Sequence, residues 1–226
     1  DPMTEEAITE CLAKYQEGNI GHNYDDRYNV YAVFKGDKDG RSLVFNGHID
    51  TMPAGNENEW NTPPHTPTMK DGRLYGLGAA DMKGGLMASV MAVQLLKDAG
   101  IKLPGDVHIT SVCDEEGGGN GSMAAIMSGE KADGVVVCEP SSDELILAHM
   151  GFVFFKVEFE GKANHSGAKW KGVSAIDKAF KVIRELEELE HKWLLTYKHP
   201  LLPAPNLNIG TIHGGSAGST VPGHCY

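Results

Sequence analysis

The fold is decided by the stretch at residues 45–51, which reads Phe45-Asn46-Gly47-His48-Ile49-Asp50-Thr51. The largely apolar run 42–45 before it predicts a buried strand that ends at the turn-forming pair Asn46-Gly47. Side chains two positions apart point the same way in an extended backbone, so His48 and Asp50 are expected to leave the strand end together. One can then bind a metal while the other orients it. The same pattern also suits a strand end with two solvated polar residues.

Length and composition set broad limits. The chain has 226 residues, 41% hydrophobic and 23% charged, which is ordinary for a globular protein of one large or two small domains. A net charge of −11 argues against nucleic acid or an anionic membrane as partner. No apolar run of membrane-spanning length and no signal peptide is evident, so a soluble chain is expected.

The four cysteines indicate the compartment. None forms a Cys-x-x-Cys pair, and two of them end apolar runs. Buried free thiols in a reducing, cytoplasmic setting are the favoured interpretation, with disulfides or metal ligands as the alternative.

Strand and helix signals alternate through the first 150 residues. Strands are expected at 29–34, 42–45, 107–113 and 134–138, and helices at 4–16, 86–99 and 122–127. A turn-rich segment, 36–40, suggests that the first two strands form a hairpin. Residues 51–72 are expected to be a loop, and the helix at 86–99 is apolar almost all round and should be buried. This alternation predicts an α/β domain, residues 1–150, with a mostly parallel central sheet.

The pattern changes near Gly151. Strands are expected at 152–159, 207–212 and 220–226, with a long helix at 174–195 that opens on a capping box formed by Ser174 and Asp177. A β-α-β-β start is not a finished layer, so residues 151–226 are interpreted as the first part of a second, α+β domain. Both domains are expected to be incomplete at the C-terminus.

Acids and histidines gather where predicted strands end. In an open α/β sheet, ligands bind outside the carboxyl ends of the strands. Carboxylates that converge there would repel one another, and divalent cations would neutralise them. Imidazole and carboxylate ligands without thiolate suit zinc, cobalt or manganese. The residues concerned are His48, Asp50, Asp81, Glu115, Glu116 and Glu139.

Glu115 and Glu116 are expected to differ in role. Adjacent side chains diverge on a non-helical backbone, so one can hold a metal while the other acts as general base toward a water. The alternative is an acidic turn before the glycine run 117–119.

Four motifs in this order resemble metallopeptidase family M20. They are Gly47-His48-Ile49-Asp50-Thr51, the glycine-rich passage Tyr75 to Gly85 that contains Asp81, Asp114-Glu115-Glu116-Gly117, and Glu139-Pro140. The resemblance covers nearly the whole chain from about Asn29. It implies a zinc-peptidase-like catalytic domain, 1–150, and an inserted ferredoxin-like lid or dimerisation domain, 151–226, through which a homodimer forms.

The resemblance also assigns roles. It implies that His48 and Glu139 hold one zinc, that Glu116 holds a second, and that Asp81 bridges them. Glu115 would be the general base, and Asp50 would orient His48. His165, in the motif 161–167, would stabilise the oxyanion, and a strained, often cis, peptide is expected after Asp81. The histidine that the second zinc needs is not found in this sequence.

The expected function is metal-dependent hydrolysis of the amide bond of a small N-acyl amino acid, of the deacetylase or desuccinylase type. Three alternatives stay open. The chain could be a dipeptidase or carboxypeptidase of the same family, a truncated non-catalytic relative that serves as an assembly partner, or a zinc-dependent esterase.

Overall fold

The computed structural model describes residues 3–15, 20–37 and 39–226. The chain divides into two units, 1–144 and 145–226. Two predicted positions lie outside the described residues: Gln16 at the end of the first helix and Lys38 in the turn-rich segment 36–40.

A four-stranded mixed sheet forms the centre of the first unit, with strand order β1-β5-β2-β6. β2 (Leu43–His48) is parallel both to β5 (Val107–Val112) and to β6 (Gly134–Val137), whereas β1 (Val30–Phe34) is antiparallel to β5. The predicted α/β fold is therefore confirmed. The sheet is mixed, because its β1 edge runs against the three parallel strands.

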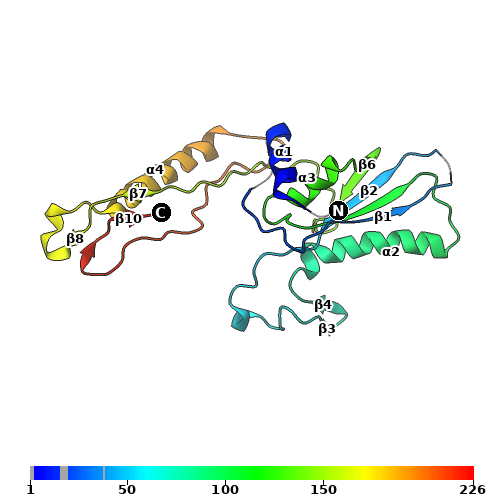
Figure 1. Ribbon diagram of the computed structural model, residues 1–226, viewed down its shortest axis with the longest axis horizontal. Coiled ribbons are helices and arrows are strands. Elements are labelled where there is room, and N and C mark those ends of the chain that lie inside the picture. The colour runs from blue at the N-terminus through cyan, green and yellow to red at the C-terminus, as the bar shows by residue number, and fades with distance from the viewer. Residues whose placement is uncertain (1–2, 16–19, 38) are drawn as a thin grey trace. The chain divides into compact units, whose positions relative to one another are not determined.

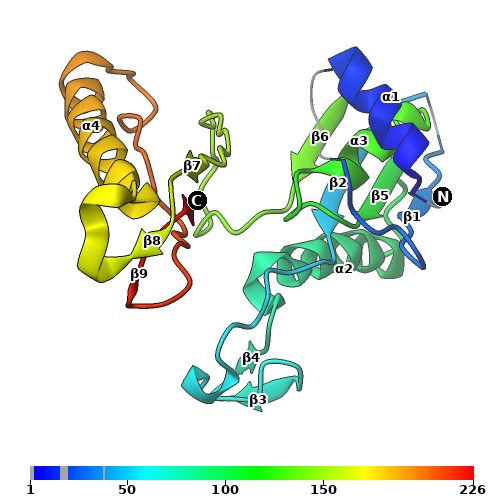
Figure 2. The same ribbon diagram turned by 60° about the vertical axis from the view of Figure 1, so that its left-hand side comes forward.

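Helices cover both faces of this sheet (Figures 1 and 2). α2 (Gly84–Asp98) lies on one face, where Leu86 and Val93 pack against alternate residues of β5. α1 (Glu5–Tyr15) and α3 (Asn120–Met127) lie on the other face, and Ile8 of α1 is fully buried there. Fully burying an aliphatic side chain of this size contributes about 1.5–3 kcal/mol. The three layers hold the strand ends in a rigid frame.

The predicted hairpin between the first two strands is wrong. β5 lies between β1 and β2 and pairs with both. Gly36 and Gly40 lie close to the start of β5: a Cβ atom on Gly36 would lie 2.5 Å from the backbone of Gly105, and one on Gly40 would lie 2.5 Å from the backbone of Pro104. Turn residues mark where the chain reverses, but they do not determine which strand becomes the neighbour.

The prediction that the helix at 86–99 is buried all round is also wrong. Met87, Met91 and Leu95 lie on the side of α2 away from the sheet and are 53%, 49% and 62% exposed. The helix buries one stripe, because a single sheet face packs against it in this unit.

A hairpin was missed at the end of the predicted loop 51–72, and its second strand lies just beyond that loop. β3 (Thr68–Lys70) pairs with β4 (Arg73–Tyr75) through Asp71-Gly72, both with positive φ. An Asp-Gly pair between two short strands is a recognised two-residue turn signal. This turn signal is present in the sequence, but the prolines before it led to the prediction of a loop.

The second unit contains one long helix, α4 (Ala175–Thr196), and short strand pairs. Ser174 Oγ accepts a hydrogen bond from Asp177 N at 3.0 Å, which confirms the predicted cap. β7 (Phe159–Glu160) pairs with β10 (His224–Cys225), and β8 (Asn164–His165) pairs with β9 (Thr220–Val221). Ala175, Ala179 and Cys225 form the small core beneath α4.

Two strands predicted in the second unit do not form as expected. Of residues 152–159 only Phe159 is in a strand, and residues 207–212 contain none. Phe154 and Phe155 are 89% and 84% exposed. Alternating apolar residues make a strand only when a partner satisfies the backbone groups. Among the described residues, no strand pairs with 152–158 or 207–212. Among the described helices, none has the length and apolar character needed to cross a membrane.

Candidate metal centre

Three parallel strands bring the predicted site residues to one edge of the sheet. β2 ends at His48, β5 ends two residues before Asp114, and β6 ends two residues before Glu139. Backbone hydrogen bonds from Ile49 N to Val112 O (2.9 Å) and from Cys138 N to Asn46 O (3.0 Å) keep these ends in register. The carboxyl ends of neighbouring parallel strands therefore place chain segments that are distant in sequence side by side, as expected for an α/β sheet.

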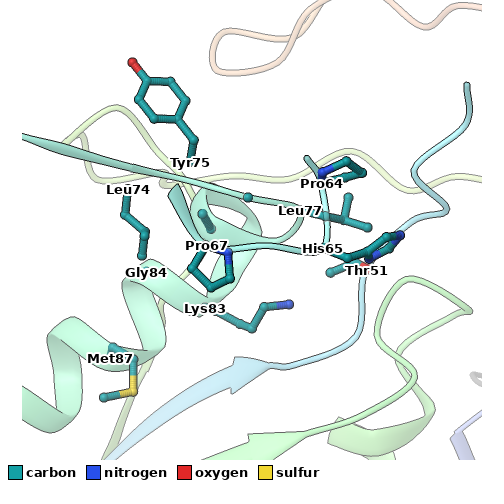
Figure 3. A pocket seen from close by; sticks show the side chains of 12 residues that line it. Thr51, Pro64, His65, Pro67, Leu74, Tyr75, Leu77, Lys83, Gly84 and Met87 are labelled. Carbon is teal, nitrogen blue, oxygen red and sulfur yellow. The ribbon is translucent and has the colours of Figure 1, made fainter. Parts of the chain in front are cut away.

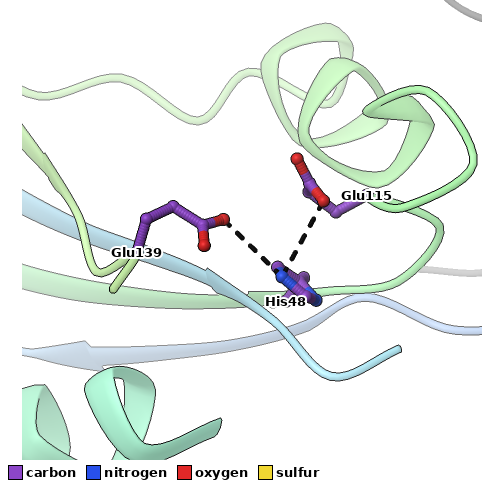
Figure 4. Close-up of side chains that lie close together, drawn as sticks. All are labelled: His48, Glu115 and Glu139. Atoms are coloured by element: carbon purple, nitrogen blue, oxygen red, sulfur yellow. Dashed lines mark ion pairs between the residues drawn. The ribbon is translucent and has the colours of Figure 1, made fainter. Parts of the chain in front are cut away.

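His48 lies at the centre of the cluster and its side chain is 1% exposed. Its Nε2 atom is 3.1 Å from Asp81 Oδ1, 3.6 Å from Glu139 Oε1 and 3.8 Å from Glu115 Oε2. Figure 4 shows Glu115 and Glu139 converging on the ring from two sides. The described residues form two groups able to hold a metal ion: His48 with Glu115 and Glu139, and His48 with Asp81 and Glu116.

The other ring nitrogen of His48 faces the main chain. Nδ1 donates to the carbonyl oxygen of Asp50 at 3.0 Å, and the Asp50 carboxylate is slightly farther, at 3.5 Å. A neutral ring with its proton on Nδ1 leaves the Nε2 lone pair directed at the carboxylates, as a metal ligand requires. Asp50 Oδ2 also accepts from Glu116 N at 3.1 Å, so this aspartate connects the histidine to the acidic turn.

Charge in the cluster is unbalanced. Burial lowers the pKa of His48, but Asp50, Asp81 and the two nearby glutamates raise it by more, so the net shift is upward. Burial raises the pKa of Glu139 to about 7, with Asp81 and Glu115 adding to the rise, and burial is also the main cause of the raised pKa of Glu115. One imidazole among these carboxylates cannot balance them, so the donor set fits a divalent cation.

Asp81 reaches the cluster from an irregular turn, Ala79–Lys83, at the start of α2. Its backbone is non-helical (φ −120°, ψ 99°), and the Asp81–Met82 peptide bond is cis, in line with the family resemblance. Lys83 Nζ donates to Ile49 O at 3.1 Å and so ties this turn to the end of β2. Lys83 was not among the predicted site residues. Its position directly after Asp81-Met82 was the available signal.

Gly85 allows α2 to approach the end of β6. A Cβ atom there would lie 2.0 Å from the carbonyl oxygen of Cys138, the residue before Glu139. The packing therefore requires glycine at position 85. From the sequence, this residue was recognised only as part of a glycine-rich passage.

His165 belongs to the second unit, where it is exposed and precedes a short helical turn. Its Nδ1 accepts from Gly167 N at 3.1 Å. The first unit contains all six other predicted residues, and the role of His165 at their cluster stays a prediction.

A cavity of about 470 Å³ lies in the first unit (Figure 3). Its wall includes Thr51, Ala79 and Lys83, which neighbour Asp50 and Asp81 in sequence. Leu74, Leu77 and Met87 make much of the remaining wall apolar, and Figure 3 shows the Lys83 ammonium on the Thr51 side of the cavity. Concave, mainly apolar spaces with a few polar groups are typical of small-molecule sites.

The model of peptidase family M20/M25/M40 matches residues 44–201. The chain belongs to this family. It is 35% identical over 215 residues to N-formyl-4-amino-5-aminomethyl-2-methylpyrimidine deformylase of Halalkalibacterium halodurans, covering 89% of this chain and 50% of the relative. It is also 35% identical over 202 residues to acetylornithine deacetylase of Vibrio parahaemolyticus, covering 88% and 52%. The chain thus spans about half the length of these curated relatives.

Solved structures agree with the fold. An M20 family metallo-carboxypeptidase from Sulfolobus solfataricus superposes with a TM-score of 0.59 at 18% identity, covering 98% of this chain and 62% of the other. The aminopeptidase PepT of Bacillus cereus gives 0.54 at 24% identity, covering 97% and 57%. At these identities the likeness is one of fold.

Proposed function

We propose that this chain carries the metal-binding part of an amidohydrolase that removes a small acyl group from an amine. The observation that supports this most directly is the convergence of Asp81, Glu115 and Glu139 on Nε2 of a fully buried histidine. A buried imidazole among several carboxylates is costly unless cations join the cluster.

In the proposed site His48 and Glu139 would hold one zinc, Glu116 would hold a second, and Asp81 would be a ligand shared by both. Cobalt or manganese would suit the same ligands. Bound dications would supply Lewis acidity, which polarises a carbonyl group and makes water more acidic. Asp50 keeps the His48 ring oriented through its carbonyl and carboxylate oxygens.

Glu115 is proposed as the general base. Its carboxylate faces the His48 Nε2 atom and is free to accept a proton from water and return it to the leaving amine. The raised pKa of Glu115, caused mainly by burial, brings its proton affinity closer to that required near neutral pH. His165 is proposed to stabilise the oxyanion from the lid domain, residues 151–226, and that domain is proposed to form a homodimer in the cytoplasm.

The substrate proposal rests on the relatives. A deformylase and a deacetylase at 35% identity both act, by their names, on an acyl group attached to a larger molecule. A small N-formyl or N-acetyl compound, such as an N-acyl amino acid, is therefore the first choice of substrate. A dipeptide or C-terminal peptide bond is the alternative within the family.

A second candidate function follows from the ligand groups. Both metal groups use His48, the single histidine that the described residues place in the cluster. This favours a chain that holds one ion and acts as a non-catalytic assembly partner. The metal content of purified protein separates the two: about two ions per chain favour the dinuclear hydrolase, and one ion or none favours the partner.

The test of the hydrolase is a panel of N-formyl and N-acetyl amino acids, dipeptides and esters, assayed with zinc, cobalt and manganese. Zinc-dependent release of amine from the N-acyl compounds is the expected result. Hydrolysis of esters alone, or equal rates after chelation of the metal, would contradict the proposal.

A further inference from the structure

Asp114 precedes the two glutamates of the cluster and is itself 4% exposed. Its carboxylate accepts from His22 Nδ1 at 2.8 Å, from Asn120 Nδ2 at 2.9 Å and from Arg27 Nη1 at 3.3 Å. His22 and Arg27 lie about 90 residues earlier in the chain, so one buried carboxylate connects the N-terminal segment to the acidic turn. Charge-assisted hydrogen bonds of this kind are the stronger ones in proteins.

The backbone around Asp114 is equally constrained. Asp114 has a φ of 62°, which few residues other than glycine and asparagine adopt. Its carbonyl accepts from Asn120 N at 3.2 Å, and the carbonyl of Glu115 accepts from the amides of Gly118 and Gly119, both at 2.9 Å. This conformation determines the directions in which Glu115 and Glu116 leave the turn.

Close packing encloses the same carboxylate. A Cβ atom on Gly117 would lie 2.5 Å from Asp114 Oδ1 and 2.7 Å from the His22 ring. Asn29 adds a further link, because its side chain accepts from Cys113 N at 3.2 Å and donates to Gly121 O at 2.7 Å. The segment 20–29 therefore contacts the turn at both of its ends. This segment lies before residue 44, where the family match begins.

We propose that Asp114, held by His22 and Arg27, is a positioning residue that sets the carboxylates of Glu115 and Glu116 for metal binding and proton transfer. Asp114 belongs to neither group of metal-ligand candidates, and in this proposal it acts through its two neighbours. This inference rests on the proposed function. A displacement of about 1 Å at a reacting group can cost about 100-fold in rate, so a loosened turn has a measurable effect.

The test is a Co²⁺ titration of the Asp114→Asn variant, followed by visible absorption. The substitution keeps the size of the side chain and removes its charge. The matched control is Glu130→Gln, which removes the charge of a carboxylate paired with His108 at 2.9 Å, away from the cluster. Asp114→Asn is expected to weaken Co²⁺ binding about 10- to 100-fold and to change the spectrum, as loss of a residue that orients a ligand does. The control is expected to match wild type.

Arg27→Gln keeps the test decisive if Asp114→Asn does not fold, and a double substitution shows through which residue Asp114 acts. Arg27→Gln changes a half-exposed donor and is expected to shift Co²⁺ affinity in the same direction by a smaller factor. In a Glu116→Gln background, Asp114→Asn is expected to weaken binding much less than in wild type, because it acts through the missing ligand.

The outcomes separate the two proposals. A wild-type protein that binds no Co²⁺ overturns the proposed function. A wild-type protein that binds Co²⁺ while Asp114→Asn and Arg27→Gln keep its affinity and spectrum overturns the positioning role alone. An effect of Asp114→Asn that is the same with and without Glu116 also overturns it, since general damage to the fold would be the cause.

Discussion

Two histidines in neighbouring parallel strands have very different surroundings. His48 ends β2 and faces Asp81, Glu115 and Glu139 within 3.8 Å of one ring nitrogen. His108, near the start of β5, meets one carboxylate, that of Glu130, at 2.9 Å, and both side chains of this pair are partly exposed. The same residue type on the same sheet therefore forms a metal-type cluster at one end and a simple ion pair at the other.

The difference lies in the neighbours. The His48 end of the sheet collects acids from three strand ends and from the turn before α2, which no single protonated imidazole can balance. His108 contacts the single carboxylate of Glu130, so no excess of acids gathers around it among the described residues. A buried histidine is a metal-ligand candidate when several carboxylates surround its ring.

The largest effect is expected for Glu115→Gln. If Glu115 is the general base, the variant should lose about 100- to 10,000-fold in kcat while metal content stays near that of wild type. Steady-state kinetics and metal analysis on the same preparation check this. Activity within a few-fold of wild type would remove Glu115 from the mechanism.

Next in size is the loss of metal affinity in His48→Gln. Removing the shared ligand should weaken binding by more than about 100-fold, beyond the effect of losing an orienting neighbour. His108→Gln is the matched control and should bind metal as wild type does. Competition titration measures the Zn²⁺ affinity of both variants. Equal affinity in the two would show that His48 is no more a metal ligand than His108 is.

A smaller effect is the stabilisation by metal. An ion that binds only the folded state, present at a free concentration of 100 times its Kd, raises the free energy of unfolding by about 2.7 kcal/mol. Zn²⁺ should therefore raise the Tm of wild type and of His108→Gln, but not of His48→Gln. Thermal denaturation with and without a chelator tests this, and a rise in Tm that survives His48→Gln would place the ion elsewhere.

The smallest effect is expected at the simple ion pair. Glu130→Gln should lower the free energy of unfolding by no more than about 1 kcal/mol, because a partly exposed pair contributes little. Urea denaturation measures the change, and metal binding should not change. A loss of several kcal/mol would show that this pair is more than a local contact.

The sequence indicated which acids gather near His48, but it did not indicate the order of the strands in the sheet. Each of the acids follows a recognisable strand or glycine-rich signal, so the convergence of His48, Asp81 and Glu139 could be anticipated. The strand that pairs with β1 could not be anticipated, because strand pairing depends on long-range contacts such as that between Gly36 and Gly105. The strands expected at 152–159 and 207–212 failed for the same reason: local alternation does not supply a partner.

What the sequence determined by itself is local. The strand signal of 42–45, the cap of α4 by Ser174 and the presence of acids beyond the strand ends follow from side-chain pattern and hydrogen-bonding capacity over a few residues. The predicted strand end at Asn46-Gly47 was wrong, because both residues pair within β2, which continues to His48. Tertiary structure alone decided that Asp114 accepts hydrogen bonds from His22 and Arg27. It also decided that the carbonyl group of Cys138 packs closely against Gly85, and that β5 lies between β1 and β2. These features join segments far apart in the chain, and such contacts depend on how whole elements pack.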